Sequence, residues 1–224
     1  MVYPQVQPGR FLERPNRFIA MVETEGQVLR CHVKNTGRCR ELLTPGAEVF
    51  LARGDAPGRK TPFDLICVRK GDRLINMDSQ APNMVAAEYL PTLFPGLEEL
   101  RGEQTFEDSR LDFSFLLDGR PGFAEVKGVT LEEGNLALFP DAPTLRGCKH
   151  LSGLIRAAGQ GYFAALLFIV QLEGTKGVSP NDRTDPEFGR LLRQAAEAGV
   201  VIRAVECRVA PDRLECIGEV PVIL

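Results

Sequence analysis

The stretches SRLDFSFLL (residues 109–117) and FAEVKG (residues 123–128) decide how the C-terminal half of the chain folds. In the first stretch, apolar side chains occupy the odd positions from 111 onward, and polar residues such as Asp112 lie between them. This alternation with a period of two predicts a strand that has one buried face. In the second stretch, Glu125 and Lys127 alternate with apolar or small residues, so we expect a second strand of the same kind.

We expect these two strands to pair as a hairpin, with Gly119-Arg120 as a two-residue loop. Leu117 then pairs near Gly122, and Asp112 falls opposite Lys127. In this register the polar side chains of both strands share one face, and the apolar side chains share the other. A slip by one residue would break that agreement between the hydrophobic pattern and the choice of loop.

The polar face of this hairpin carries Asp112, Ser114, Glu125 and Lys127. Diagonal neighbours on paired strands lie about 7–8 Å apart, so the two carboxylates can converge on one cation. Carboxylates suit Mg²⁺ or Mn²⁺, and the bound ion activates water for phosphodiester hydrolysis, while a nearby lysine stabilises the developing anion. The alternative is a solvated strand face with a Glu–Lys ion pair worth about 0–1 kcal/mol. The spacing alone leaves both readings open.

The rest of the C-terminal half mixes strands and helices. Further strands are expected over 104–106, 163–172 and 200–209, and helices over 83–90, 145–158 and 186–198. Asn83 is the expected N-cap of the first helix, whereas Asp185, Pro186 and Gly199 mark the ends of the third. The last two strands are separated by helices, which suits crossover connections. These patterns predict a mixed α/β sheet with flanking helices.

The first 80 residues read as short strands separated by turns that are rich in glycine and proline. The expected strands cover residues 17–23, 27–34, 47–53, 63–69 and 74–77. A small barrel of the OB type fits this size, and such barrels often bind oligonucleotides on one face. We therefore expect two domains, with a boundary near residue 80: residues 1–80 form the OB-like domain, and residues 81–224 form the mixed domain.

Composition limits the class of protein. The chain has 224 residues, of which 44% are apolar and 25% charged, as in ordinary globular proteins. The apolar run Phe163–Val170 is far shorter than the about 20 residues that a membrane-spanning helix needs, so no membrane partner is expected. The six cysteines are scattered and form no C-x-x-C motif, and the N-terminal sequence lacks an apolar signal segment. A reduced, cytoplasmic protein is therefore expected.

Charge is distributed unevenly along the chain. Residues 1–80 carry 13 basic and 9 acidic side chains, a net charge of +4, and residues 81–224 carry 14 and 21, a net charge of −7. The candidate nucleic-acid-binding residues are Arg14, Arg17, Lys34, Arg38 and Arg40 in the first half, and Arg146, Lys149 and His150 at a helix start in the second. No helix-turn-helix pattern is present, so the expected binding is sequence-tolerant. The alternative is an ordinary solvated surface.

Several longer motifs go beyond these local patterns. They are RPNRFIA (14–20), HVKNTGRCREL (32–42), QAPN (80–83), SRLDF (109–113), EVKGVTL (125–131), FPDAPTLRGCKHL (139–151) and DPEF (185–188). Together they resemble the sugar fermentation stimulation protein family (SfsA-type) over essentially the whole chain. The resemblance implies a prokaryotic, cytoplasmic, DNA-binding protein linked to the regulation of sugar metabolism. It also implies an N-terminal OB-like domain followed by a domain similar to PD-(D/E)xK nucleases.

The resemblance carries over to individual residues. Asp112 matches the aspartate of the nuclease pattern, and Glu125 and Lys127 match its E-x-K, which makes these three the candidate catalytic residues. Glu88, on the helix before the first core strand, is the candidate for a third carboxylate that binds metal together with Asp112 and Glu125. The expected activity is Mg²⁺- or Mn²⁺-dependent cleavage of DNA, with RNA as the other candidate substrate.

Two other classes of function stay open. One is a non-catalytic DNA-binding regulator that uses the same face only to bind phosphate or metal. The other is a small-molecule sensor, for which the sequence offers no motif. A homodimer is compatible with the sequence, which leaves the oligomeric state open.

Overall fold

The computed structural model describes residues 1–224 except 36, 38 and 55–57. The chain divides into two compact units. Unit 1 comprises Met1–Ala81, Gln171–Glu173 and Cys207–Glu215, and unit 2 comprises Pro82–Val170, Gly174–Glu206 and Cys216–Leu224. From the sequence, every residue after 80 was expected to belong to the second domain. The structure instead places two short segments of the C-terminal half, 171–173 and 207–215, within unit 1.

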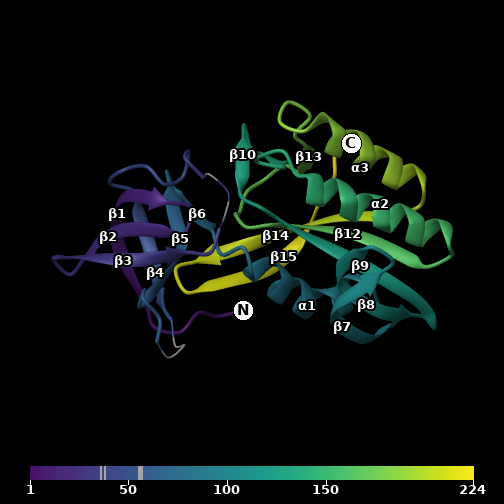
Figure 1. The fold of residues 1–224 in the computed structure, drawn as a ribbon, viewed down its shortest axis with the longest axis horizontal. Coiled ribbons are helices and arrows are strands. Elements are labelled where there is room, and N and C mark those ends of the chain that lie inside the picture. Colours follow the sequence, from purple (N-terminus) through teal and green to yellow (C-terminus); the bar gives the residue numbers. More distant parts are fainter. Residues whose placement is uncertain (36, 38, 55–57) are drawn as a thin grey trace. The chain divides into compact units, whose positions relative to one another are not determined.

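Unit 1 is built around one sheet. Its strands are β1 (Val6–Asn16), β2 (Ile19–Thr24), β3 (Gln27–Val33), β4 (Glu48–Arg53), β5 (Phe63–Lys70) and β6 (Arg73–Asn76). They follow the order β3-β2-β1-β4-β5-β6, and β3 also pairs with β5 in parallel, so that β1–β5 close into a five-stranded barrel (Figure 1). The predicted OB-like barrel is therefore confirmed.

Strand β1 was not predicted from the sequence, although it lies in the middle of the sheet order. Pro8, Gly9 and Pro15 interrupt its sequence, and such residues argue against a strand interior. Gly9 is needed there because β1 and β2 approach closely: a Cβ at residue 9 would lie 2.5 Å from Cγ1 of Val22. Gly9 thus argues against a strand in the sequence, yet it is the residue that allows β1 and β2 to pack closely.

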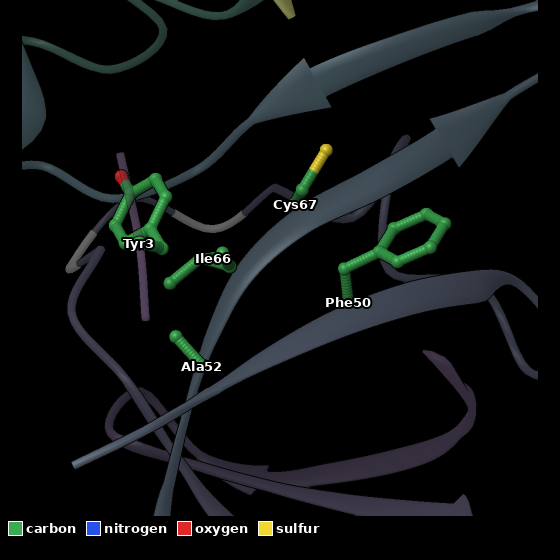
Figure 2. Packing of buried hydrophobic residues seen from close by; sticks show 5 residues of the cluster. All are labelled: Tyr3, Phe50, Ala52, Ile66 and Cys67. Atoms are coloured by element: carbon green, nitrogen blue, oxygen red, sulfur yellow. The ribbon is translucent and has the colours of Figure 1, made fainter. Parts of the chain in front are cut away.

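One hydrophobic cluster of unit 1 explains why a late segment of the chain belongs to it. Its buried members are Tyr3, Phe50, Ala52, Ile66 and Cys67 (Figure 2). The partly buried side chains that pack against it are Met1, Val6, Leu74 and Val209. Val209 comes from segment 207–215, so an apolar side chain near the end of the sequence completes a surface built by the first 75 residues.

Unit 2 is a mixed α/β structure. Its main strands are β7 (Leu97–Phe106), β8 (Ser109–Leu117), β9 (Arg120–Val129), β12 (Phe163–Val170), β14 (Val201–Ala210) and β15 (Arg213–Val220), and its helices are α1 (Ala81–Leu93), α2 (Leu145–Gly159) and α3 (Pro186–Glu197). The last residues of β14 and the first of β15 belong to unit 1. The sheet order is β15-β14-β12-β9-β8-β7. A smaller sheet contains β10 (Leu131–Glu133), β11 (Leu136–Phe139) and β13 (Val178–Pro180).

The centre of the large sheet is parallel, because β9 pairs with β12 and β12 with β14 in the same direction. Helices α2 and α3 make the two crossovers and lie side by side on one face of the sheet (Figure 1). Strands β7 and β8 add an antiparallel hairpin at one edge. The predicted mixed α/β sheet with flanking helices is confirmed, whereas β10, β11, β13 and β15 were not predicted from the sequence.

The predicted register of the β8–β9 hairpin is wrong by two residues. Leu117 pairs with Arg120 instead of lying near Gly122, and the turn is Asp118-Gly119. Both turn residues have positive φ, at 50° and 77°, as a type I′ hairpin turn requires. A shift by two residues keeps every side chain on its predicted face, so the polar row of the hairpin survives the error.

Helix α1 begins at Ala81, so Asn83 lies inside its first turn and the prediction that Asn83 caps the helix is wrong. The predicted ends of α3 are confirmed: the Asp185 side chain accepts the N–H of Phe188, Pro186 starts the helix, and Gly199 follows it with a φ of 87°. Over the described residues, no helix is both long and apolar enough to cross a membrane.

Candidate active site

Asp112 lies on β8 and is held through both of its carboxylate oxygens. Oδ2 accepts the backbone N–H of Val126 on β9 at 2.8 Å, and Oδ1 accepts a hydrogen bond from the Asn83 side-chain amide of α1 at 2.9 Å. The strand pairing between β8 and β9 runs up to Phe113 and Ala124, immediately before this contact. A carboxylate on the polar face of one strand is therefore fixed by the neighbouring strand and by a helix.

Glu125 lies on β9 and is 2% exposed. Its Oε1 atom accepts hydrogen bonds from the Lys127 ammonium, two residues along the strand, and from Nδ1 of His150 on α2. Its Oε2 atom is buried and has no hydrogen-bond partner within the described part of the chain. Buried carboxylate oxygens are normally paired, so an unpartnered one indicates a place for a ligand.

His150 joins these strands to a helix. It is 4% exposed, and its Nδ1 atom also lies 3.4 Å from Nζ of Lys127. Its Nε2 atom accepts a hydrogen bond from Nε of Arg146, one helical turn earlier, at 3.4 Å. Both His150 and Arg146 were expected from the sequence to bind nucleic acid. The structure places His150 inside the cluster, whereas Arg146 is exposed.

The environment shifts the pKa values of the two carboxyl groups in opposite directions. Burial, followed by the negative charge of Glu125, raises the pKa of Asp112. Burial would also raise the pKa of Glu125, but the His150 hydrogen bond and the Lys127 charge outweigh it, so this pKa lies below its ordinary value. Pairs of carboxyl groups whose pKa values diverge are typical of active sites, although structural ion pairs produce the same effect.

The N-terminal end of helix α2, which carries Arg146 and His150, is held by hydrogen bonds to two side chains. Thr144 is its N-cap, and the Thr144 hydroxyl accepts the N–H of Gly147 at 3.0 Å. The backbone N–H of Thr144 donates to Oδ2 of Asp185 at 2.8 Å, while Oδ1 of Asp185 accepts from Phe188 at the start of α3. One buried carboxylate therefore serves the first turns of two helices and positions the turn that carries Arg146 and His150.

Two other candidates in unit 2 lie at the surface. Glu88 is exposed on α1. It does not complete a metal site with Asp112 and Glu125, because no three His, Cys, Asp or Glu side chains form a metal-binding group among the residues that the structure describes. The α1 side chain that contacts Asp112 is the Asn83 amide. The Lys149 side chain is 51% exposed, with Nζ 3.4 Å from Oδ2 of Asp108.

In unit 1, Arg14 and Lys34 contact the protein's own acceptors. The Arg14 guanidinium donates to the carbonyl oxygens of Arg17 and Asn35, both at 2.7 Å. The Lys34 ammonium lies between two buried carboxylates, 3.4 Å from Asp64 and 3.1 Å from Asp78. Both side chains thus have structural contacts, and their assignment to nucleic-acid binding stays a prediction. Arg17 and Arg40 are exposed, and Arg38 lies outside the described residues.

Comparisons with known proteins agree with this architecture. A family model described as the SfsA N-terminal OB domain matches residues 12–77, and one described as the sugar fermentation stimulation protein RE domain matches residues 80–213. The chain belongs to the sugar fermentation stimulation protein family. The resemblance drawn from the motifs is therefore confirmed.

Relatives in this family match almost the whole chain. A sugar fermentation stimulation protein homolog of Desulfitobacterium hafniense is 53% identical over 216 residues, which cover 96% of this chain and 95% of the relative. The homolog of Ruminiclostridium cellulolyticum is 46% identical and is covered completely, as is this chain. Among solved structures, that of Pyrococcus furiosus SfsA in complex with Ca²⁺ matches with a TM-score of 0.89 at 30% identity, covering 100% of this chain and 98% of that one.

Proposed function

We propose that this protein binds DNA and hydrolyses its phosphodiester bonds with the help of Mg²⁺ or Mn²⁺ held by Asp112 and Glu125. The observation that carries the proposal is the unpartnered Oε2 atom of Glu125, a buried oxygen on the same strand face as Asp112. A buried carboxylate oxygen with no donor costs free energy unless a cation or donor occupies the position beside it.

The donor set fits a hard cation. Mg²⁺ prefers oxygen ligands and is usually bound by one or two carboxylates while it keeps several waters, so a third protein ligand is not required. The relative from Pyrococcus furiosus is described as a complex with Ca²⁺, another cation that takes oxygen ligands. When bound, such an ion supplies an activated water and neutralises charge that develops on the phosphate.

The chain's own residues would bind and orient the substrate around that position. Lys127 keeps its ammonium within the cluster through Glu125, where it can donate to the attacking water or to a phosphate oxygen. Arg146 is exposed on α2, one turn before His150, and Lys149 is half-exposed on the same helix. Their positive charges suit phosphates along a nucleic-acid strand.

Unit 1 supplies further positive charge for DNA. The exposed candidates are Arg17, beside the start of β2, and Arg40. Phe18, next to Arg17, is 50% exposed, and it provides an apolar ring for contact with a base. Contacts of this kind recognise the backbone and the faces of bases, so we expect little dependence on base sequence.

The test is a cleavage assay with labelled single-stranded, duplex and branched DNA and with RNA, in Mg²⁺ or Mn²⁺. Glu125→Gln removes one negative charge from the site, and Glu197→Gln, at an exposed position of α3, removes the same charge elsewhere. Cleavage by the wild type and by Glu197→Gln, with loss in Glu125→Gln, supports the proposal. Equal cleavage by all three proteins rejects the assigned residues.

A non-catalytic DNA-binding regulator is the second candidate. It is favoured by the absence, within the described residues, of any metal-binding group of three His, Cys, Asp or Glu side chains. Two carboxylates then hold an ion weakly, and the face serves to bind DNA. Retained, salt-sensitive DNA binding without cleavage under every ion tested would support this candidate over the nuclease.

A further inference from the structure

We propose that His150 is a positioning residue: it holds Oε1 of Glu125 so that Oε2 stays available to the cation, and Arg146 fixes the tautomer of His150 that does so. This inference rests on the proposed metal site. It assigns His150 a role different from the nucleic-acid contact expected from its place beside Arg146 and Lys149 in the sequence.

Burial is the first argument. His150 is 4% exposed and Glu125 is 2% exposed, so the imidazole has almost no surface with which to meet a phosphate. Its Nδ1 atom contacts the carboxylate of Glu125 directly. A donor to one oxygen of a ligating carboxylate fixes the orientation of the other oxygen, as outer-shell partners do in metal sites.

The tautomer follows from the partners. The Oε1 atom that Nδ1 contacts also accepts a hydrogen bond from the Lys127 ammonium, and a carboxylate oxygen acts as an acceptor, so Nδ1 carries the proton. Nε2 is then the acceptor atom of the ring, and it receives the Nε–H of Arg146 at 3.4 Å. A proton on Nε2 would face another donor, so Arg146 stabilises the Nδ1–H form.

Lys127 cannot replace this hydrogen bond alone. Lys127 and His150 both donate to Oε1, and Oε2 receives no donor from the described residues. Lys127 extends from the same strand as Glu125 on a flexible side chain, whereas the His150 imidazole comes from α2, whose first turn is held by Thr144 and Asp185. The helix therefore provides the rigid donor.

The chain offers a direct test of the tautomer, because its only histidines are His32 and His150. In ¹⁵N-labelled, cation-free protein, the long-range imidazole spectrum of His32→Gln contains His150 alone. We expect its pattern to show a proton on Nδ1 and none on Nε2, and to move toward a mixture of tautomers in the double variant with Arg146→Ala. A ring protonated at Nε2 in the protein with Arg146 intact would overturn the proposal.

Binding of Mn²⁺, measured by calorimetry, tests the positioning role separately from activity. His150→Asn keeps an amide donor near the place of Nδ1, whereas His150→Gln places its amide near Nε2. We expect His150→Gln to bind Mn²⁺ at least tenfold more weakly than the wild type, His150→Asn to stay within about threefold, and His32→Gln to be unchanged. Circular dichroism and thermal melting verify that each variant is folded.

The outcomes separate the two proposals. If the wild type binds Mn²⁺ and both His150 variants bind it equally well, the metal site stands and the positioning role is wrong. If the wild type binds no divalent cation, the proposed function fails, and the positioning role fails with it. If His150→Gln does not fold, the imidazole spectrum of His32→Gln still decides the question, because a ring protonated at Nε2 overturns the proposal.

Discussion

The side-chain amide of Asn83 donates to Oδ1 of Asp112 at 2.9 Å, so helix α1 contributes an amide, and not a carboxylate, to the aspartate of the site. The contact joins residues that are 29 positions apart in the sequence. It places the first turn of α1 against β8, and the position of Asp112 therefore depends on a residue that has no catalytic chemistry of its own.

Replacing Asn83 with alanine is expected to lower the free energy of unfolding by about 1.5–3 kcal/mol, because a hydrogen bond to a charged, partly buried group is lost. Urea denaturation followed by circular dichroism measures the change. Met84→Ala, at a 52% exposed position in the same helical turn, is the matched control and is expected to change stability little. Equal stability of the Asn83→Ala variant and the control would show that the contact is unimportant.

Asp185→Ala is expected to destabilise the protein by about 1–4 kcal/mol, since the carboxylate receives N–H groups at the starts of both α2 and α3. Asp185→Asn keeps an acceptor oxygen and should lose less stability than the alanine variant. Thermal and urea unfolding of the two variants measure the difference. A loss of less than about 1 kcal/mol in Asp185→Ala would contradict the double role.

The pH dependence of stability is expected to reflect Asp64 in unit 1. Burial alone would raise its pKa, but the Arg59 hydrogen bond, the Lys34 charge and the His32 hydrogen bond lower it below the ordinary value. A lowered pKa in the folded state means that the carboxylate stabilises the fold above about pH 5, where the unfolded chain is also ionised, and that this stability is lost as the pH falls through the folded-state pKa.

The comparison of wild type with Asp64→Asn tests this sign. At pH 7 the variant should unfold at a lower urea concentration, and the difference should shrink as the pH is lowered toward 3. Asp72→Asn, at an exposed turn position, is the control. A gap between wild type and Asp64→Asn that stays constant or widens in acid would refute the assignment of the pKa direction.

The exposed arginines of unit 1 are expected to contribute to DNA affinity, and this contribution is expected to fall as the salt concentration rises. Arg17→Ala and Arg40→Ala should each weaken binding similarly for different sequences and reduce the slope of log affinity against log salt by about 1. Lys34→Met should act differently, because Lys34 pairs with Asp64 and Asp78 and its loss leaves buried charges. Fluorescence anisotropy over a salt series, with unfolding curves, separates the two effects.

The sequence predicted those strands and helix ends that are specified by residues close together in the chain. The alternation around Asp112 and the caps at Asp185 and Gly199 are both borne out by the structure. The hairpin turn was misplaced because Gly119 was paired with Arg120, whereas Asp118-Gly119 is the dipeptide that tolerates two positive φ values. The predicted register was shifted by two residues, an even number. The side chain of Asp112 was therefore assigned to the correct face of the sheet, whereas the residue opposite it on β9 was not predicted correctly.

The site contacts required the tertiary structure. Glu125 and His150 are 25 residues apart, and nothing in the periodicity of β9 or α2 indicates that the imidazole faces the carboxylate. Asn83 carried the signal of a helix cap, which concealed its contact with Asp112. Lys34 appeared as one of several basic residues, since its two partners, Asp64 and Asp78, lie 30 and 44 positions away.

The inclusion of residues 207–215 in unit 1 has a consequence for folding during synthesis on the ribosome. The strands of the barrel are synthesised first, yet the apolar cluster around Tyr3 and Phe50 receives Val209 only after most of the chain has been made. The nascent barrel therefore carries an uncovered apolar surface while unit 2 is being translated. Translation must proceed into β15, the last strand, before unit 1 has all of its residues, and to residue 224 before unit 2 does.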